Sequence, residues 1–130
     1  MRYEEFLAAV RDRGEYVGRD EAEQVTVAVL EVLASRINAG EVKDLASQLP
    51  TPLSEVLQET ATGEAESYGV EEFGRRVAER TGARPRTAVW DASAVLSTLA
   101  DAVSGGELNQ ILTQLPSGYA ALFGKPELSD

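Results

Sequence analysis

Two glutamates in equivalent contexts are the first residues whose type and spacing could do chemistry. Glu41 and Glu107 each follow a glycine, and each precedes a Gln-Leu-Pro tripeptide by seven residues. The two side chains could form a carboxylate pair, with Gln48 and Gln114 orienting a ligand. Acid–base chemistry without histidine would need such a pair, with pKa values perturbed by its surroundings.

A structural role is the alternative for this signature. Each glycine would turn the chain in the left-handed conformation, each glutamate would suit the first turn of the next helix, and each glutamine would satisfy carbonyls at the end of that helix. Leucine and proline would then form the following corner. We favour this structural interpretation for all ten signature residues. They are Gly40, Glu41, Gln48, Leu49, Pro50, Gly106, Glu107, Gln114, Leu115 and Pro116.

A run of arginines is the second candidate site. Five arginines fall within twelve residues, and Arg84 and Arg86 lie just before the start of a predicted helix. Free backbone N–H groups and the helix dipole favour anions at such a place, so Arg80, Arg84 and Arg86 could bind a phosphate or a carboxylate. The alternative is a salt-bridged helix face, because two Glu–Arg pairs have the favourable i,i+4 spacing. These pairs are Glu71–Arg75 and Glu72–Arg76.

The absence of two residue types excludes several classes of function. The 130-residue chain contains no histidine and no cysteine. Ser-His-Asp and Cys-His nucleophiles, Cys/His zinc sites, iron–sulfur clusters and disulfides therefore cannot be built from it. Its acidic residues match no Ca²⁺-binding loop, and no glycine-rich loop joins a strand to a helix. We expect no catalytic activity, no cofactor and no metal, with catalysis by carboxylates alone as the alternative.

The net charge limits the partners. The chain has 12 Lys and Arg against 22 Asp and Glu, a formal net charge of −10 at pH 7. This charge argues against duplex nucleic acid and against anionic membranes as partners. The acidic start of the chain has no apolar signal segment, and the most apolar stretch is too short to span a bilayer. We therefore expect a cytoplasmic protein.

A duplicated segment contains the glutamate signature. Residues 28–50 and 94–116 share ten identities in 23 positions at a constant offset of 66 residues, where about one or two would be expected by chance. Helical spacing of apolar residues occurs in both copies, and the alternation typical of strands is missing. The sequence predicts an all-α fold of eight helices, arranged as two pseudo-symmetric four-helix repeats packed into one bundle-like domain.

The predicted boundaries place a single helical domain at residues 1–124. Repeat 1 covers residues 1–57, a polar linker covers 58–67, and repeat 2 covers 68–124. Residues 125–130 are predicted to form a flexible tail.

Local signals predict where individual helices begin. Asp20 and Glu23 have the spacing of a capping box at the start of the first central helix. The second central helix is expected to begin near Thr87, and Thr51 is the expected N-cap of the fourth helix. Trp90 is the single tryptophan. We interpret it as filling space between the repeats, with ligand stacking as the alternative.

Three short motifs carry a family resemblance. They are the opening Tyr3-Glu4-Glu5-Phe6-Leu7, the turn Ser104-Gly105-Gly106-Glu107 and the two Gln-Leu-Pro corners. With these motifs the chain resembles a bacterial all-helical family, domain of unknown function 2267, over residues 1–124. The first copy departs from the family's turn, because it reads Asn38-Ala39-Gly40-Glu41. The resemblance implies a tandem-repeat helical fold, and no activity or functional residue comes with it.

These observations favour a small helical protein-interaction or regulatory module, whose partner is another protein or a second copy of the chain. Such a role requires exposed apolar area in a groove between the repeats. The alternative is a sensor or carrier that holds an anionic or apolar small molecule between the repeats. Arg80, Arg84 and Arg86 would then anchor the anionic group of the ligand.

Overall fold

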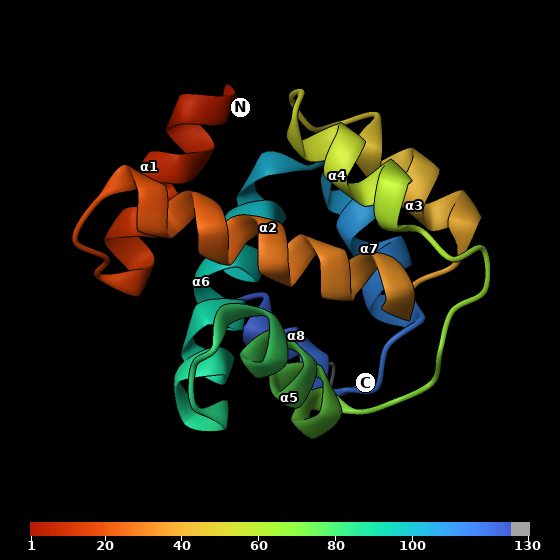
Figure 1. The fold of residues 1–130 in the computed structure, drawn as a ribbon. Helices are drawn as coiled ribbons and strands as arrows, with labels where there is room; N and C mark the ends of the chain where they lie inside the picture. Colours follow the sequence, from red (N-terminus) through yellow and green to blue (C-terminus); the bar gives the residue numbers. More distant parts are fainter. Residues whose placement is uncertain (126–130) are drawn as a thin grey trace.

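Eight α-helices and no strand make up residues 1–125, the part of the chain that the computed structural model describes (Figure 1). The helices are α1 (Tyr3–Gly14), α2 (Arg19–Arg36), α3 (Ala39–Ala46), α4 (Leu53–Thr60), α5 (Val70–Thr81), α6 (Pro85–Ala102), α7 (Gly105–Thr113) and α8 (Gly118–Leu122). The prediction of an all-α fold with eight helices is confirmed. Beyond Lys125, the predicted tail lies outside the described residues. Within them, every helix is too short or too polar to cross a membrane.

The helix bounds recur at the spacing of the sequence repeat. From α1 to α5 both ends shift by 67 residues, and from α2 to α6 both ends shift by 66 residues. The difference arises in the connection after the first helix, which has four residues in the first half (15–18) and three in the second (82–84). Each half, α1–α4 or α5–α8, therefore contributes one central helix of 18 residues. Pseudo-symmetry of the halves in space stays a prediction.

The two central helices are surrounded by the others. Helix α2 crosses the middle of the view in Figure 1 and contacts α1, α4, α5 and α6, while α6 contacts α1, α2, α5 and α8. A helix surrounded in this way needs apolar residues on most of its surface, and α2 accordingly buries Val25, Val29, Leu30, Val32 and Leu33. One core cluster includes residues from all eight helices, which is typical of a single folding unit.

Each half also covers the central helix of the other half. Helix α1 packs against both α2 and α6, and α5 packs against both α6 and α2. An ion pair accompanies each crossing contact. Arg13 of α1 binds Asp101 of α6, and the Arg80 guanidinium of α5 lies 3.1 Å from the Glu31 carboxylate of α2. The two halves are therefore interleaved.

The start of α2 corrects the predicted capping box. Helix α2 has Gly18 as its N-cap and no side-chain cap, so the pairing of Asp20 with Glu23 is wrong. Glu23 instead accepts a hydrogen bond from the Tyr3 hydroxyl of α1. Glu23 therefore bonds a residue of another helix, and not the start of its own helix.

Two other helices begin one or two residues away from the predicted positions. Helix α6 begins at Pro85 and not at Thr87, because proline suits the first helical position, where its missing N–H costs nothing. Pro52, and not Thr51, is the residue that precedes α4.

Gly40 and Gly106 do not turn the chain in the left-handed conformation. Both are helical residues in the first turns of α3 and α7, and neither has a positive φ. The C-cap residues of the preceding helices are Ile37 and Val103, and each has extended backbone with a φ of −114°. The prediction of a left-handed glycine at these corners is therefore wrong.

A glycine is required at the junction between α1 and α6. The Trp90 Nε1–H of α6 donates a hydrogen bond to the Gly14 carbonyl at 3.0 Å. The Tyr16 ring lies against Gly14, where an added Cβ would be 2.7 Å from Tyr16 Cδ2 and still closer to two other ring carbons. Any larger residue would displace the tyrosine. Trp90 thus joins the two halves, although half of its surface stays exposed.

Replacing Gly14 by Ala should lower the free energy of unfolding by about 2 kcal/mol, because the new methyl group overlaps the Tyr16 ring. Gly105→Ala is the matched control, since Gly105 is a helical residue of α7 and nothing lies within 4 Å of a Cβ there. This substitution should not lower the free energy of unfolding, because alanine favours the helix over glycine. Urea unfolding followed by circular dichroism measures both. A G14A variant as stable as the wild type would show that the close approach is not required.

Candidate functional site

The structure brings Glu41 and Glu107 together at the contact between α3 and α7. Asp44 joins them, and one carboxylate oxygen from each of the three residues lies within 4.8 Å of the other two. Glu107 is only 6% exposed. The carboxylate pair considered from the sequence is therefore present, and Asp44 is a third member that the sequence analysis missed. Asp44 gave no signal there, because Gln110 occupies its equivalent position in the second half.

The negative charges and buried oxygens of these carboxylates are poorly balanced by the residues around them. Burial, the neighbouring Glu41 and the negative charge of Asp44 together raise the pKa of Glu107 to about 7. The Oε2 atoms of Glu41 and Glu107 are buried and have no hydrogen-bond partner among residues 1–125. Buried polar atoms without a partner are rare in folded proteins, so each one requires an explanation.

The signature glutamines act between the two halves. Gln48 Oε1 accepts a hydrogen bond from the Ser104 backbone N–H at 2.7 Å, and Asn38 Nδ2 donates to Gln114 Oε1 at 3.1 Å. Ser104 and Asn38 are the N-caps of α7 and α3. Each glutamine therefore reaches the helix start of the other half, where the sequence analysis placed it at the end of its own helix. This exchange holds the starts of α3 and α7 side by side.

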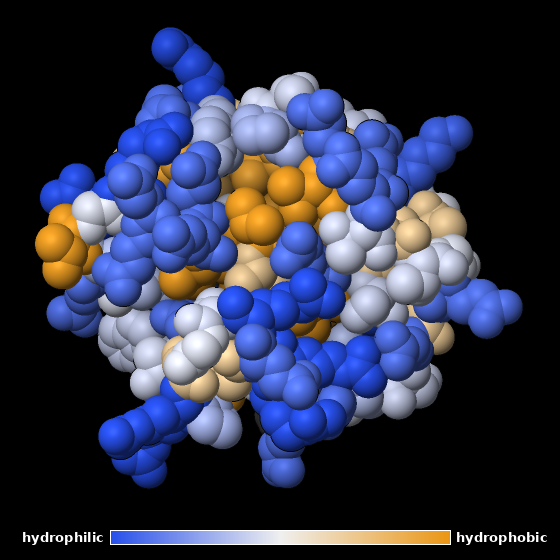
Figure 2. Space-filling model, viewed as in Figure 1, coloured by the Kyte–Doolittle hydropathy of each residue, from blue (hydrophilic) through white to orange (hydrophobic). Residues whose placement is uncertain are grey.

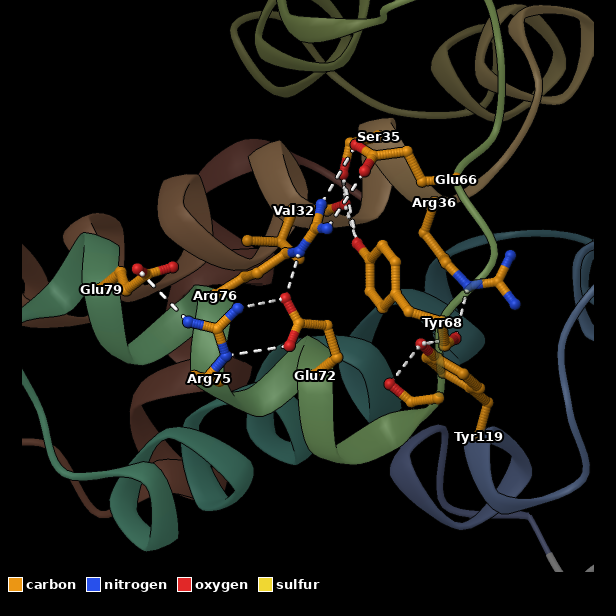
Figure 3. A network of polar contacts seen from close by, with 11 residues as sticks. Val32, Ser35, Arg36, Glu66, Tyr68, Glu72, Arg75, Arg76, Glu79 and Tyr119 are labelled. Atoms are coloured by element: carbon orange, nitrogen blue, oxygen red, sulfur yellow. Dashed lines mark hydrogen bonds and ion pairs between the residues drawn. The ribbon is translucent and has the colours of Figure 1, made fainter.

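The first arginines of the predicted cluster are bound to carboxylates (Figure 3). Glu72 accepts hydrogen bonds from Arg75 and Arg76, which lower the pKa of Glu72 to about 2. Arg76 also forms two hydrogen bonds with Glu66, at 3.1 and 3.0 Å. The predicted Glu72–Arg76 pair is confirmed, whereas Arg75 pairs with Glu72 and Glu79. This part of the cluster is a salt-bridged helix face.

Tyr68 lies at the centre of the same network (Figure 3). The guanidinium of Arg76 lies 4.1 Å from the centre of its ring, and that of Arg36 lies 5.4 Å away. Arg36 Nε also donates to the Tyr68 carbonyl, and so does the Tyr119 hydroxyl. The connection between α4 and α5 is therefore attached to α2, α5 and α8. These contacts pair the charges of the network with one another. A pocket of about 620 Å³ lies beside the network, and its lining includes Glu66, Glu72, Arg75 and Arg76.

The remaining three arginines lie in different surroundings. Arg80 is paired with Glu31 and lines a pocket described below. Arg84 is the N-cap of α6, Arg86 lies in the first turn, and both are exposed outside the lining of that pocket. Their joint role as an anion site stays a prediction.

A pocket of about 540 Å³ lies between the two halves. Its walls come from α2, from the connection after α1, and from the α5–α6 corner, which are far apart in the sequence. The lining residues are Tyr16, Glu21, Glu23, Gln24, Val25, Val27, Ala28, Glu31, Arg80, Thr81, Ala83, Thr87 and Asp91. Four carboxylates and one arginine therefore line the pocket together with apolar residues of α2.

Asp91 is the most buried acid of this pocket, at 4% exposed. The Tyr16 hydroxyl donates a hydrogen bond to Asp91 Oδ1 at 2.5 Å. Burial raises the pKa of Asp91, the bond from Tyr16 opposes this, and the charge of Glu21 raises the pKa further. Glu31 is neutralised by Arg80, and Glu23 lies 3.6 Å from Arg19. Glu21 and Asp91 have no cationic partner within 4.0 Å in the described part of the chain.

The fold and these two sites define an all-helical protein with acidic sites between its interleaved halves. Residues 3–122 match the family described as an uncharacterized conserved protein, DUF2267, and the chain belongs to that family. No curated protein matches the chain.

Replacing Glu107 by Gln removes one of three facing negative charges without changing the size of the side chain. At about pH 8.5, in a buffer with a chelator, we expect the free energy of unfolding to rise by about 1–3 kcal/mol. The folded-state pKa of Glu107 is raised, so its protonated form stabilises the fold at low pH, and this stabilisation is lost as the pH rises through about 7. The advantage of E107Q should therefore shrink at about pH 5.5.

Urea unfolding of the wild type and E107Q at both pH values measures this difference. A variant that is less stable than the wild type at high pH, or an advantage that does not depend on pH, would show that the three carboxylates do not repel one another.

Proposed function

We propose that the protein is a small-molecule binding module whose pocket takes an organic cation with an apolar body, such as an alkyl amine. The observation that carries this proposal is the buried Asp91 carboxylate, which faces the pocket near Glu21 without a cationic partner. This proposal departs from the anionic ligand considered from the sequence.

Charge supports a cationic ligand. Of the five charged residues in the lining, the single cation, Arg80, is already bound to Glu31. An anion would have to displace that bond and then face Asp91. A cation would meet Asp91 and Glu21 directly, and the net charge of −10 would raise its local concentration around the protein.

Shape and chemistry support a small, partly apolar ligand. A volume of about 540 Å³ is in the range of small-molecule sites, which combine apolar walls with a few convergent polar groups. Val25, Val27 and Ala28 of α2 supply the apolar wall. The hydrogen bond from Tyr16 holds the Asp91 carboxylate in position, which lowers the entropy cost of binding.

Thermal unfolding in the presence of straight-chain amines and diamines tests the proposal, with carboxylic acids of the same chain lengths for comparison. At saturating concentration we expect an amine to raise the Tm of the wild type by about 2–5 °C, since a ligand that binds only the folded state stabilises it. The acids should cause no shift. Asp91→Asn should weaken amine binding at least tenfold, because it removes the buried charge.

Two variants make the experiment specific. The amide of D91N can still accept the hydrogen bond from Tyr16, so the variant should fold. Glu64→Gln is the matched control, because Glu64 is exposed in the connection between α4 and α5, outside the pocket lining. The proposal fails if no amine stabilises the wild type, if the acids do so instead, or if D91N keeps the full shift.

The protein-interaction role favoured by the sequence has a separate observation in its support. Val17 is 92% exposed and Trp90 is 50% exposed, and both belong to the junction around Gly14. Figure 2 also shows apolar side chains gathered near the middle of the face over α2, with hydrophilic side chains around them. The surface is therefore not evenly polar, and a docking role is our second candidate. A docking partner would not depend on the charge of Asp91, so D91N separates the two candidates.

A further inference from the structure

We propose that Glu41, Asp44 and Glu107 bind a hard divalent cation between α3 and α7, with Ca²⁺ preferred over Mg²⁺. This site is separate from the amine pocket and departs from our expectation that the protein binds no metal. That expectation rested on the absence of His and Cys and of a contiguous Ca²⁺ loop. The three carboxylates come from two helices that are distant in sequence, so no short sequence motif indicates the site.

The buried oxygens point to a missing ligand. Glu107 is more than nine-tenths buried, and its Oε2 has no hydrogen-bond partner among the described residues. The Oε2 atom of Glu41 is also buried and has no hydrogen-bond partner among the described residues. Both residues belong to the cluster in which carboxylate oxygens converge within 4.8 Å. Two unpartnered buried acceptors in a cluster with a third carboxylate are costly unless a cation or a proton joins them.

The charge balance favours a divalent cation. When all three carboxylates are ionised they carry three negative charges, and the nearby starts of α3 and α7 each contribute about half a positive charge. About two negative charges therefore remain. The backbone N–H groups of Glu41 and Glu107 are occupied by Asn38 and Ser104, so these N–H groups are not available to the carboxylates.

The ligand chemistry selects the ion. Carboxylate oxygens suit Ca²⁺, Mg²⁺ and Mn²⁺ better than softer metals. Ca²⁺ accepts irregular geometries with six to eight oxygen ligands, whereas Mg²⁺ requires a nearly ideal octahedron and gives up its bound water reluctantly. Three carboxylates that converge from two helices therefore suit Ca²⁺ better than Mg²⁺.

The site is held in place and can be reached. The hydrogen bonds of Gln48 to Ser104 and of Asn38 to Gln114 fix the relative positions of the two helix starts. Such support keeps ligand side chains in a binding geometry before the ion arrives. Asp44 is exposed, so the ion can enter on its side, and water can complete the coordination. Three protein ligands predict a moderate affinity, with a Kd on the order of 10–1000 µM.

Calorimetric titration and thermal unfolding with CaCl₂ test the proposal on chelator-treated full-length protein at about pH 8 and constant ionic strength. We expect one Ca²⁺ per chain and a rise in Tm of about 3–6 °C. MgCl₂ should bind at least tenfold more weakly, and KCl of equal ionic strength should cause no shift. Glu107→Gln and Glu41→Gln should abolish the Ca²⁺ effect, and Asp44→Asn should weaken binding at least tenfold.

Glu55→Gln is the matched control. Glu55 occupies the same third helical position in α4 that Glu41 and Glu107 occupy in α3 and α7, but it is exposed and outside the cluster. E55Q should keep the full Ca²⁺ response. Because E107Q is expected to be more stable than the metal-free wild type, a lost response would not reflect unfolding. The proposal is overturned if the wild type shows no saturable response, or if E107Q retains it. Either result would leave a shared proton as the group that joins the carboxylates.

Discussion

The structure depends on the fact that neither half of the chain can cover its own central helix. Helices α2 and α6 have apolar residues on most sides, and each buries Val and Leu side chains against helices of both halves. Helix α1 supplies part of the cover for α6, and α5 supplies part of the cover for α2. Removing apolar surface from water is the main favourable contribution to folding. We therefore expect the two halves to be stable only together.

Both proposed sites follow from this interleaving. The pocket lies where the connection after α1 and the α5–α6 corner meet α2 beside Asp91. The three-carboxylate cluster exists because α3 and α7 meet at their starts, where the glutamine exchange holds them. Residues that differ between the two halves supply key groups of both sites. Asp44 of the carboxylate cluster corresponds to Gln110 in the second half, and Asp91 of the pocket corresponds to Val25 in the first half.

Much of the fold could be predicted from the sequence, because helix positions depend on the spacing of apolar residues and on the repeat. The errors arose where a distant partner overrides a local one. Glu23 has the spacing of a capping box, yet it bonds Tyr3. Gln48 lies near the end of α3, yet it bonds the start of α7.

The sites were harder to predict than the fold. The Glu41–Glu107 pair was visible because duplication repeats it, whereas Asp44 has no repeated partner. The pocket combines Tyr16, Asp91 and Arg80 from three segments, and no spacing within the sequence reports that combination. The sequence also did not indicate that the pocket is negatively charged, because the pairing of Arg80 with Glu31 depends on how α5 packs against α2.

Equilibrium unfolding followed by two probes tests the interleaving most directly. Circular dichroism reports on all the helices, and the fluorescence of Trp90, the single tryptophan, reports on the junction where its indole binds Gly14. If the halves stabilise each other, both probes should show one cooperative transition with the same midpoint in urea. Two separate transitions, or a fluorescence change completed while half of the helical signal remains, would show that the halves fold independently and would contradict the account.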